Sequence, residues 1–142
     1  MYNNSIKVGD IGEAMALAEF TKRGLNVLIP FSENCPYDLV VDKGDRLVKV
    51  QCKTTKHVKN NCMEFQICRS NGFTYNKERY QVNEVDYIFV YCIENNYMGL
   101  VPIQDTKQSL TFNIRLSSPR NNQKKGIHLY SDYEFNKIVD TL

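Results

Sequence analysis

The sequence has no tryptophan, only two histidines and four prolines, and no long apolar run. No stretch approaches the roughly 20 apolar residues that a membrane-spanning helix needs, so we expect no membrane partner. The first residues, Met1-Tyr2-Asn3-Asn4, are too polar for a secretory signal. We therefore expect an intracellular, cytoplasmic protein.

Paired cysteine motifs are also missing. The chain has five cysteines, an odd number, and none forms a C-x-x-C pair. Their spacing from His57 or His128 matches no common zinc finger, and two scattered histidines do not make a histidine-based metal site. We expect reduced thiols that pack as small apolar side chains, namely Cys35, Cys52, Cys62, Cys68 and Cys92.

What is present is enough for one compact domain. The chain has 142 residues, of which 42% are hydrophobic, so a single domain over residues 1–142 can bury a core. We find no internal repeat. The net charge of +2 is too small to identify a partner, so the distribution of charge matters more than its sum.

Two apolar runs, Pro36 to Asp42 and Val48 to Thr54, are separated by Lys43-Gly44-Asp45-Arg46. Both runs are typical of β-strands, and Gly44-Asp45 suits a two-residue type II′ hairpin turn. That turn pairs Lys43 with Arg46. The resulting register places Asp38 opposite Gln51, with Lys53 two residues further along the same face. Alternation of this kind also fits a strand that has one solvated face and no chemical role, so that alternative stays open.

A helix is predicted around Gly12 to Phe20, ending at Gly24, because the segment is rich in helix formers and its apolar residues recur at helical spacing. Glu13 lies at the edge of the apolar stripe, where carboxylates are rare unless paired. Asp10 is one turn earlier and is predicted to cap the start of the helix.

These segments together resemble the PD-(D/E)XK nuclease superfamily. The resemblance depends on Gly9-x-x-Gly12-Glu13 with its helix, on Pro36 to Asp42, and on Val50-Gln51-Cys52-Lys53-Thr54. Within the superfamily the chain is most similar to the small single-domain endonucleases that include intron-encoded homing enzymes, and more distantly to Holliday-junction resolvases. The similarity runs from about Ile6 to Pro102 and includes Val85 to Tyr91 as a later core strand.

The resemblance implies metal-dependent hydrolysis of phosphodiester bonds. Glu13, Asp38 and the backbone carbonyl of Cys52 would bind Mg²⁺, for which Mn²⁺ would substitute. Lys53 would orient or deprotonate the attacking water or stabilise charge on phosphorus, and Gln51 would position the water. Most of the superfamily has a carboxylate where this chain has Gln51, although the homing-enzyme branch shares the replacement. A neutral amide leaves open a weak second metal, or an inactive relative.

The implied substrate is double-stranded DNA, cut at a specific site by a homing endonuclease of a prokaryotic, phage or organellar host. A junction resolvase and a non-catalytic DNA-binding module with the same fold are the alternatives. Cutting both strands calls for two active sites, so we expect a homodimer or homotetramer. Candidate DNA contacts, some of which could equally be solvated loop residues, are Lys56, His57, Lys59, Lys77, Arg79, Arg115, Arg120, Lys124 and Lys125.

The remaining segments give a coarse pattern. Strands are predicted at Met63 to Cys68, Tyr87 to Ile93 and Met98 to Ile103, the last two forming a hairpin through Glu94-Asn95-Asn96. Asn71-Gly72 predicts a turn, and Tyr75 to Tyr80 a loop facing DNA. Ser131 and Glu134 predict a capping box for a final helix with Phe135, Ile138, Val139 and Leu142 as its apolar stripe. The resemblance implies an α/β fold, with a central mixed β-sheet flanked by helices and a restriction-endonuclease-like core.

Overall fold

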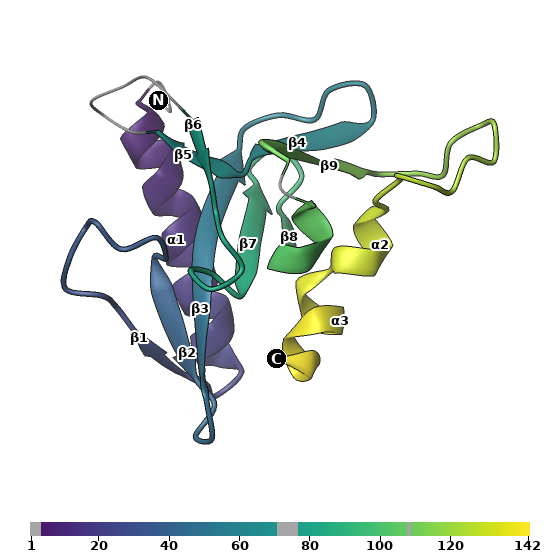
Figure 1. Cartoon of the computed structure of the whole chain (residues 1–142). Coiled ribbons are helices and arrows are strands. Elements are labelled where there is room, and N and C mark those ends of the chain that lie inside the picture. The colour runs from purple at the N-terminus through teal and green to yellow at the C-terminus, as the bar shows by residue number, and fades with distance from the viewer. Residues whose placement is uncertain (1–3, 71–76, 108) are drawn as a thin grey trace.

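A computed structural model describes residues 4–70, 77–107 and 109–142 of the chain (Figure 1). Its centre is a five-stranded sheet in the order β1-β2-β3-β7-β8. The strands are β1 (Asn26–Leu28), β2 (Leu39–Asp42), β3 (Leu47–Thr55), β7 (Tyr87–Cys92) and β8 (Tyr97–Pro102). Only β3 and β7 pair in parallel, and the other neighbours are antiparallel. The predicted mixed sheet is confirmed.

The β2–β3 hairpin has the predicted register. Leu39 pairs with Val50 and Asp42 with Leu47, and the N–H of Lys43 donates to the carbonyl of Arg46 at 2.9 Å. Gly44 has a φ of +86°, a conformation that glycine adopts without the steric cost a Cβ would bring. The turn therefore fixes which residues of the two strands lie side by side.

Helix α1 (Ser5–Lys22) is longer at its start than the sequence pattern predicted. Its N-cap is Asn4, whose side chain accepts a hydrogen bond from the N–H of Ile6 at 2.9 Å. The prediction that Asp10 caps the helix is wrong, because Asp10 lies inside it. The predicted end is confirmed: the N–H of Gly24 donates to Thr21 and that of Leu25 to Phe20, in the pattern of a Schellman motif.

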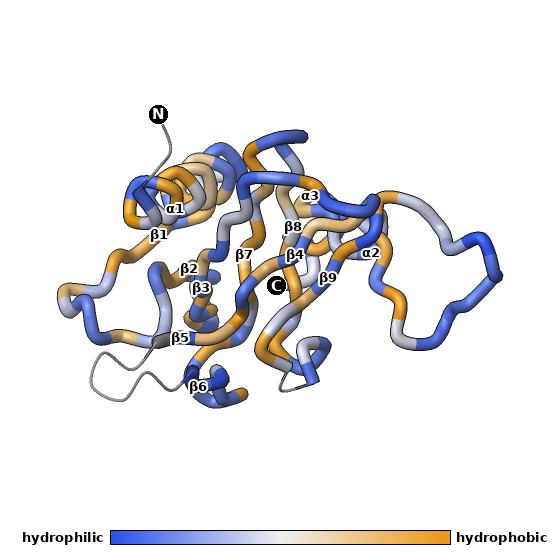
Figure 2. Tube along the Cα trace, turned by 90° about the horizontal axis from the view of Figure 1, so that it is seen from above, coloured by the Kyte–Doolittle hydropathy of each residue, from blue (hydrophilic) through white to orange (hydrophobic). Residues whose placement is uncertain are grey.

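Two apolar clusters lie on opposite faces of the central sheet. Helix α1 and the C-terminal segment cover one face, where Phe20, Phe89 and Phe135 pack edge to face or tilted with ring centroids 5.1 to 6.3 Å apart. A two-stranded ribbon of β4 (Cys62–Gln66) and β9 (Thr111–Arg115) covers the other face. Figure 2 shows α1 and the ribbon on the two sides of the sheet.

The C-terminal segment does not form the continuous helix that was predicted. It consists of α2 (Tyr130–Tyr133), α3 (Phe135–Ile138) and a 3₁₀ turn, η2 (Val139–Thr141). Glu134 is extended and pairs with Gly99 of β8, which interrupts the helix, and Ser131 lies within α2 and not at its N-cap. The predicted capping box is therefore wrong, although Phe135, Val139 and Leu142 are buried as the apolar stripe required.

The remaining elements are short. The predicted β7–β8 hairpin is confirmed, with Asn96 at a φ of +58°, and β8 leads into η1 (Ile103–Thr106). Strand β5 (Cys68–Ser70) pairs with β6 (Lys77–Arg79), so part of the predicted DNA-facing loop is a strand. The predicted Asn71-Gly72 turn and Tyr75 lie outside the described residues. All five cysteines are free thiols, and no helix among the described residues is long and apolar enough to cross a membrane.

Candidate active site

Asp38 lies where β2 leaves the regular pairing of the hairpin. Its N–H donates to the carbonyl of Val50 at 2.9 Å, and its Oδ2 accepts a hydrogen bond from the N–H of Cys52 at 2.8 Å. The carboxylate thus takes the place of a backbone acceptor on the β3 ladder. This bond fixes the Asp38 side chain against the backbone between Gln51 and Lys53.

Glu13 approaches Asp38 from α1. The Glu13 side chain is exposed, and not shielded at the edge of an apolar stripe as its spacing predicted. Although this side chain reaches solvent, the surrounding protein removes part of its hydration and so raises the pKa of the Glu13 carboxyl, and the nearby carboxylates of Asp38 and Asp10 raise it further. Burial also raises the pKa of Asp38, while the Cys52 hydrogen bond and the Lys53 cation lower it. The helix and the hairpin therefore bring the two carboxylates close enough for Asp38 to disfavour the charged form of Glu13.

Lys53 lies close enough to Asp38 for the two charges to interact. Its Nζ donates to the carbonyl of Cys68 at 3.0 Å and lies 5.2 Å from the centre of the Tyr80 ring. Burial lowers the pKa of Lys53, whereas the Asp38 carboxylate raises it. Gln51 is buried, and its Nε2 donates a long hydrogen bond of 3.4 Å to the carbonyl of Cys52. Asp38 and Gln51 therefore meet at the Cys52 backbone.

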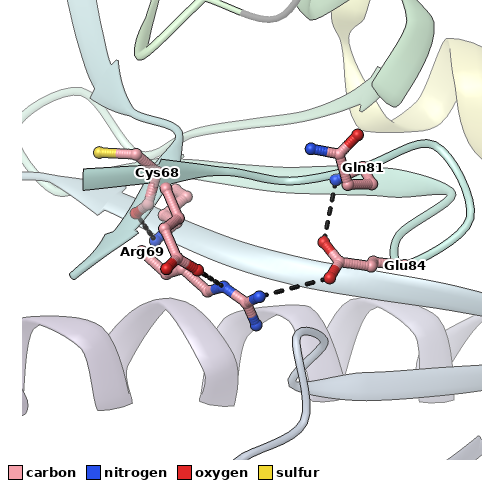
Figure 3. Close-up of polar contacts among 6 residues, drawn as sticks. Cys68, Arg69, Gln81 and Glu84 are labelled. Atoms are coloured by element: carbon pink, nitrogen blue, oxygen red, sulfur yellow. Dashed lines mark hydrogen bonds and ion pairs between the residues drawn. The ribbon is translucent and has the colours of Figure 1, made fainter. Parts of the chain in front are cut away.

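The carbonyl that holds Lys53 is itself supported by an ion-pair cluster (Figure 3). Arg69, next to Cys68, contacts Glu78 and Glu84 at 3.3 Å each, and the second Glu84 oxygen accepts a hydrogen bond from the N–H of Gln81. These contacts join β5 to β6 and to the turn that follows β6. They fix β5, whose Cys68 carbonyl accepts the hydrogen bond from Lys53.

The residues present fit a hard divalent cation. Among the described residues no group of three His, Cys, Asp or Glu side chains could hold a metal ion. The site instead offers the carboxylates of Glu13 and Asp38, an amide and backbone carbonyls, and the repulsion between the carboxylates would be relieved by a cation. Mg²⁺ suits such a site because it uses oxygen ligands and retains several waters, whereas a structural zinc site needs four protein ligands.

A family model for PD-(D/E)XK endonuclease matches residues 3–136. The chain belongs to the PD-(D/E)XK endonuclease family. Members of the family generally use divalent metal ions, which agrees with the fit above. No curated protein shows significant sequence similarity to this endonuclease.

Two solved structures share the fold of this endonuclease. A bacterial homing endonuclease, I-Ssp6803I, aligns with a TM-score of 0.75 at 20% identity, over 97% of this chain and 93% of that one. Hjc of Archaeoglobus fulgidus, a Holliday junction resolvase from an archaeal hyperthermophile, aligns with a TM-score of 0.54 at 14% identity, over 93% of this chain and 95% of that one. The restriction-endonuclease-like core is thereby confirmed.

A groove of about 1030 Å³ adjoins the candidate active site of the endonuclease, and Cys52 and Lys53 are among its lining residues. Its lining comes from the end of β3 and the β3–β4 loop, from the β4–β9 ribbon, and from the start of α1 at Ser5, Val8 and Gly9. Of the candidate DNA contacts, it includes Lys56, His57, Lys59 and Arg115. Groove residues that the sequence analysis did not select include Glu64, Gln66, Asn113 and His128, although the alternation of Met63-Glu64-Phe65-Gln66 was a usable signal.

The other candidate DNA contacts lie elsewhere. Lys77 and Arg79 line a separate depression beside Arg69. Arg120 and Lys124 line shallow depressions along the loop between β9 and α2, which also carries Lys125. Figure 2 shows this loop projecting from the body of the protein with a hydrophilic tip. The structure thus places one group of basic residues on the groove beside the candidate active site and a second beside Arg69. A third lies on the β9–α2 loop, where the depression that Arg120 lines shares Arg115 with the groove.

Proposed function

We propose that this endonuclease cuts double-stranded DNA at a specific site, with Mg²⁺ as its cofactor, in the manner of a homing endonuclease. The observation that carries the proposal is the convergence of Glu13 and Lys53 on Asp38. Lys53 also lines a groove together with Lys56, His57 and Lys59. The groove offers cations to a polyanion, and the convergent groups are those that phosphodiester hydrolysis needs.

Glu13 and Asp38 are the proposed metal ligands, together with the Cys52 carbonyl. The bound Mg²⁺ would supply charge neutralisation at the scissile phosphate and lower the pKa of a water. Asp38 is pre-positioned for this role by the Cys52 N–H, which leaves its second oxygen available. Glu13 depends on the placement of α1 and contributes the second negative charge.

Lys53 and Gln51 act on the water and on the phosphate. Burial lowers the pKa of Lys53 and so reduces the cost of a neutral amine, but the Asp38 carboxylate nearby favours the ammonium form. We assign Lys53 the role of orienting the attacking water or stabilising charge on phosphorus. Gln51 lies beside it and would orient the water through its amide, without adding charge to the metal site.

The two structures that share this fold suggest different DNA substrates for this chain. The homing endonuclease gives the better superposition, and this supports a linear duplex as the substrate in preference to a four-way junction. A domain of this size covers limited DNA, and cutting both strands requires two active sites. We therefore propose that residues 1–142 form one nuclease domain that works as a homodimer or homotetramer.

Cleavage-site selection from a randomised duplex library in Mg²⁺ tests the proposal. We expect enrichment of one extended sequence, cut in both strands, and no cleavage in EDTA. A four-way junction supplied in the same reaction should be cut no faster than linear DNA. Preferential cutting of the junction would replace the proposal by a resolvase, and salt-dependent binding without cleavage in Mg²⁺ or Mn²⁺ would indicate a non-catalytic module.

A further inference from the structure

The β4–β9 ribbon has two faces of different chemistry. Four of its side chains point into the core and are almost fully buried: Met63, Phe65, Phe112 and Ile114. The alternate residues face outward and line the groove next to the active site: Cys62, Glu64, Gln66, Asn113 and Arg115. A strong core therefore fixes the ribbon, and its polar face is left directed at the groove.

The outward side chains form an ordered array. Glu64 lies opposite Asn113, and Cys62 lies opposite Arg115. The Nε2 of Gln66 donates to Oε1 of Glu64 at 3.4 Å, so these neighbours on β4 extend in the same direction. Cross-strand and same-strand neighbours thus present amide, carboxylate and guanidinium groups on one surface.

These residue types differ from those that only bind phosphate. Arginine pairs with guanine, asparagine and glutamine with adenine, and glutamate accepts from the amino group of cytosine. The outward face carries all of these types and no lysine, whereas the adjoining loop supplies Lys56 and Lys59. Phosphate contacts position a protein on DNA, and contacts with base edges specify the sequence. The groove therefore carries residue types suited to base edges on the ribbon and lysines suited to phosphate on the adjoining loop.

The dimensions of the ribbon agree with this division. The major groove of B-DNA, about 12 Å wide, admits a two-stranded β-ribbon. Five residues per strand at about 3.4 Å each give a length of about 17 Å, which corresponds to about five base pairs. Alternate residues such as Glu64 and Gln66 are then spaced about two base pairs apart.

Contacts with residues after β9 hold the ribbon rigidly. The N–H of Arg115 donates to the carbonyl of His128 at 2.8 Å, and the His128 ring stacks on Phe112 with centroids 4.2 Å apart. The hydroxyl of Tyr133 contacts His128 Nδ1 at 3.2 Å and donates to Asp105 at 2.9 Å. Reading of bases needs side chains on a fixed support, and these contacts provide one.

We propose that the β4–β9 ribbon enters the major groove of duplex DNA and reads base edges through Glu64, Gln66, Asn113 and Arg115. The ribbon and Lys53 line the same groove, so the base pairs that it reads lie within a few steps of the bond that is cut. The inference rests on the proposed function, since it assigns sequence recognition to a wall of the same DNA-binding site.

Binding selection in Ca²⁺ on a randomised duplex library tests the inference without requiring cleavage. We expect Gln66→Ala, Asn113→Ala and Arg115→Ala each to reduce the preference at one or two adjacent base pairs by about 5- to 150-fold. Asn113→Asp should exchange a preference for adenine for one for cytosine, a gain that loss of folding cannot produce. Lys59→Ala should weaken binding to all sequences about equally, and Asn34→Ala, an exposed amide away from the groove, should change nothing.

Two results would overturn the inference: base preferences of the ribbon variants that coincide with the wild-type profile, or a wild-type protein that selects no sequence at all. Cleavage of the selected duplex in Mg²⁺ is measured separately. A wild-type protein that selects a sequence and loses preferences in the ribbon variants, but cuts nothing, would refute the proposed activity and leave the ribbon assignment standing. Cleavage by the wild type, with unchanged base preferences in the ribbon variants, would support the proposed activity and refute the ribbon assignment.

Discussion

Gly12 of α1 packs directly against the side chain of Thr54 in β3. A Cβ added at Gly12 would lie 1.9 Å from Thr54 Oγ1, 3.3 Å from its Cβ and 3.8 Å from its Cγ2. Thr54 Oγ1 is buried and has no hydrogen-bond partner among the described residues. This contact sets the distance between the helix that carries Glu13 and the strand that carries Gln51 and Lys53.

Gly12→Ala should therefore impair the active site through the position of Glu13. A clash of this size forces α1 away from β3, and a displacement of about 1 Å can reduce a rate about a hundredfold. We expect weaker Mn²⁺ binding by titration calorimetry. We also expect a lower pKa of Glu13 by NMR, because Glu13 regains hydration and moves away from Asp38. Slower cleavage should accompany both changes.

The double variant Gly12→Ala/Thr54→Ala provides the control. Removal of Oγ1 and Cγ2 leaves only the Thr54 Cβ at 3.3 Å, a tight contact that small shifts can relieve, so metal binding should recover. Thr54→Val preserves the bulk of threonine and should not rescue Gly12→Ala. Recovery with valine, or a loss of thermal stability with unchanged Mn²⁺ affinity, would show that the contact does not position Glu13.

A second prediction concerns pH and stability. Since the pKa of Glu13 is raised in the folded protein above its ordinary value of 4.5, protonation favours folding, and metal-free stability falls as the pH rises through the raised value. Glu13→Gln removes both the cost of a partly desolvated charge and the repulsion with Asp38. We expect a higher melting temperature than wild type at pH 7 without divalent ions, and no increase at pH 4, by calorimetry across this range. Mg²⁺ should stabilise wild type more than the variant; equal stabilisation of both would contradict the assigned role of Glu13.

A third prediction concerns Gln51. Gln51→Glu keeps nearly the same shape and adds a charge that can bind metal. The variant should therefore still cleave DNA, with a single-turnover rate different from that of wild type. Gln51→Ala loses both the amide oxygen and the donor to the Cys52 carbonyl, and should reduce the single-turnover rate about tenfold to a thousandfold. An alanine variant as fast as wild type would remove Gln51 from the mechanism.

The hairpin could be predicted from sequence because its register depends on a local signal. The turn at Gly44 decides which residues pair, and Asp38, Gln51 and Lys53 follow from it. The start of α1 was harder to predict, since both Asn4 and Asp10 are suitable caps and the choice depends on packing further along the helix. The prediction of a continuous last helix was also wrong, because the break at Glu134 comes from its pairing with Gly99, which is distant in sequence.

The groove could not be predicted, because one of its walls forms only when two strands far apart in sequence pair, and no local pattern specifies that pairing. Strands β4 and β9 are separated by more than 40 residues, and only their pairing brings Glu64 opposite Asn113. Thr111-Phe112-Asn113-Ile114-Arg115 alternates as clearly as Met63-Glu64-Phe65-Gln66, but alternation does not identify a partner strand. The local arrangement of the candidate catalytic residues was therefore easier to predict than the surface that would contact DNA.

The most direct test is single-turnover cleavage of the selected duplex at saturating Mg²⁺, with wild type compared with Asp38→Ala and Lys53→Ala. Asp38→Ala should abolish cutting while binding without metal stays the same or tightens, because a carboxylate near phosphate repels it. Lys53→Ala should slow cleavage more than either Gln51 substitution, since its ammonium group has no neighbouring substitute. Undiminished cutting by either alanine variant would contradict the assignment of this site as the active site.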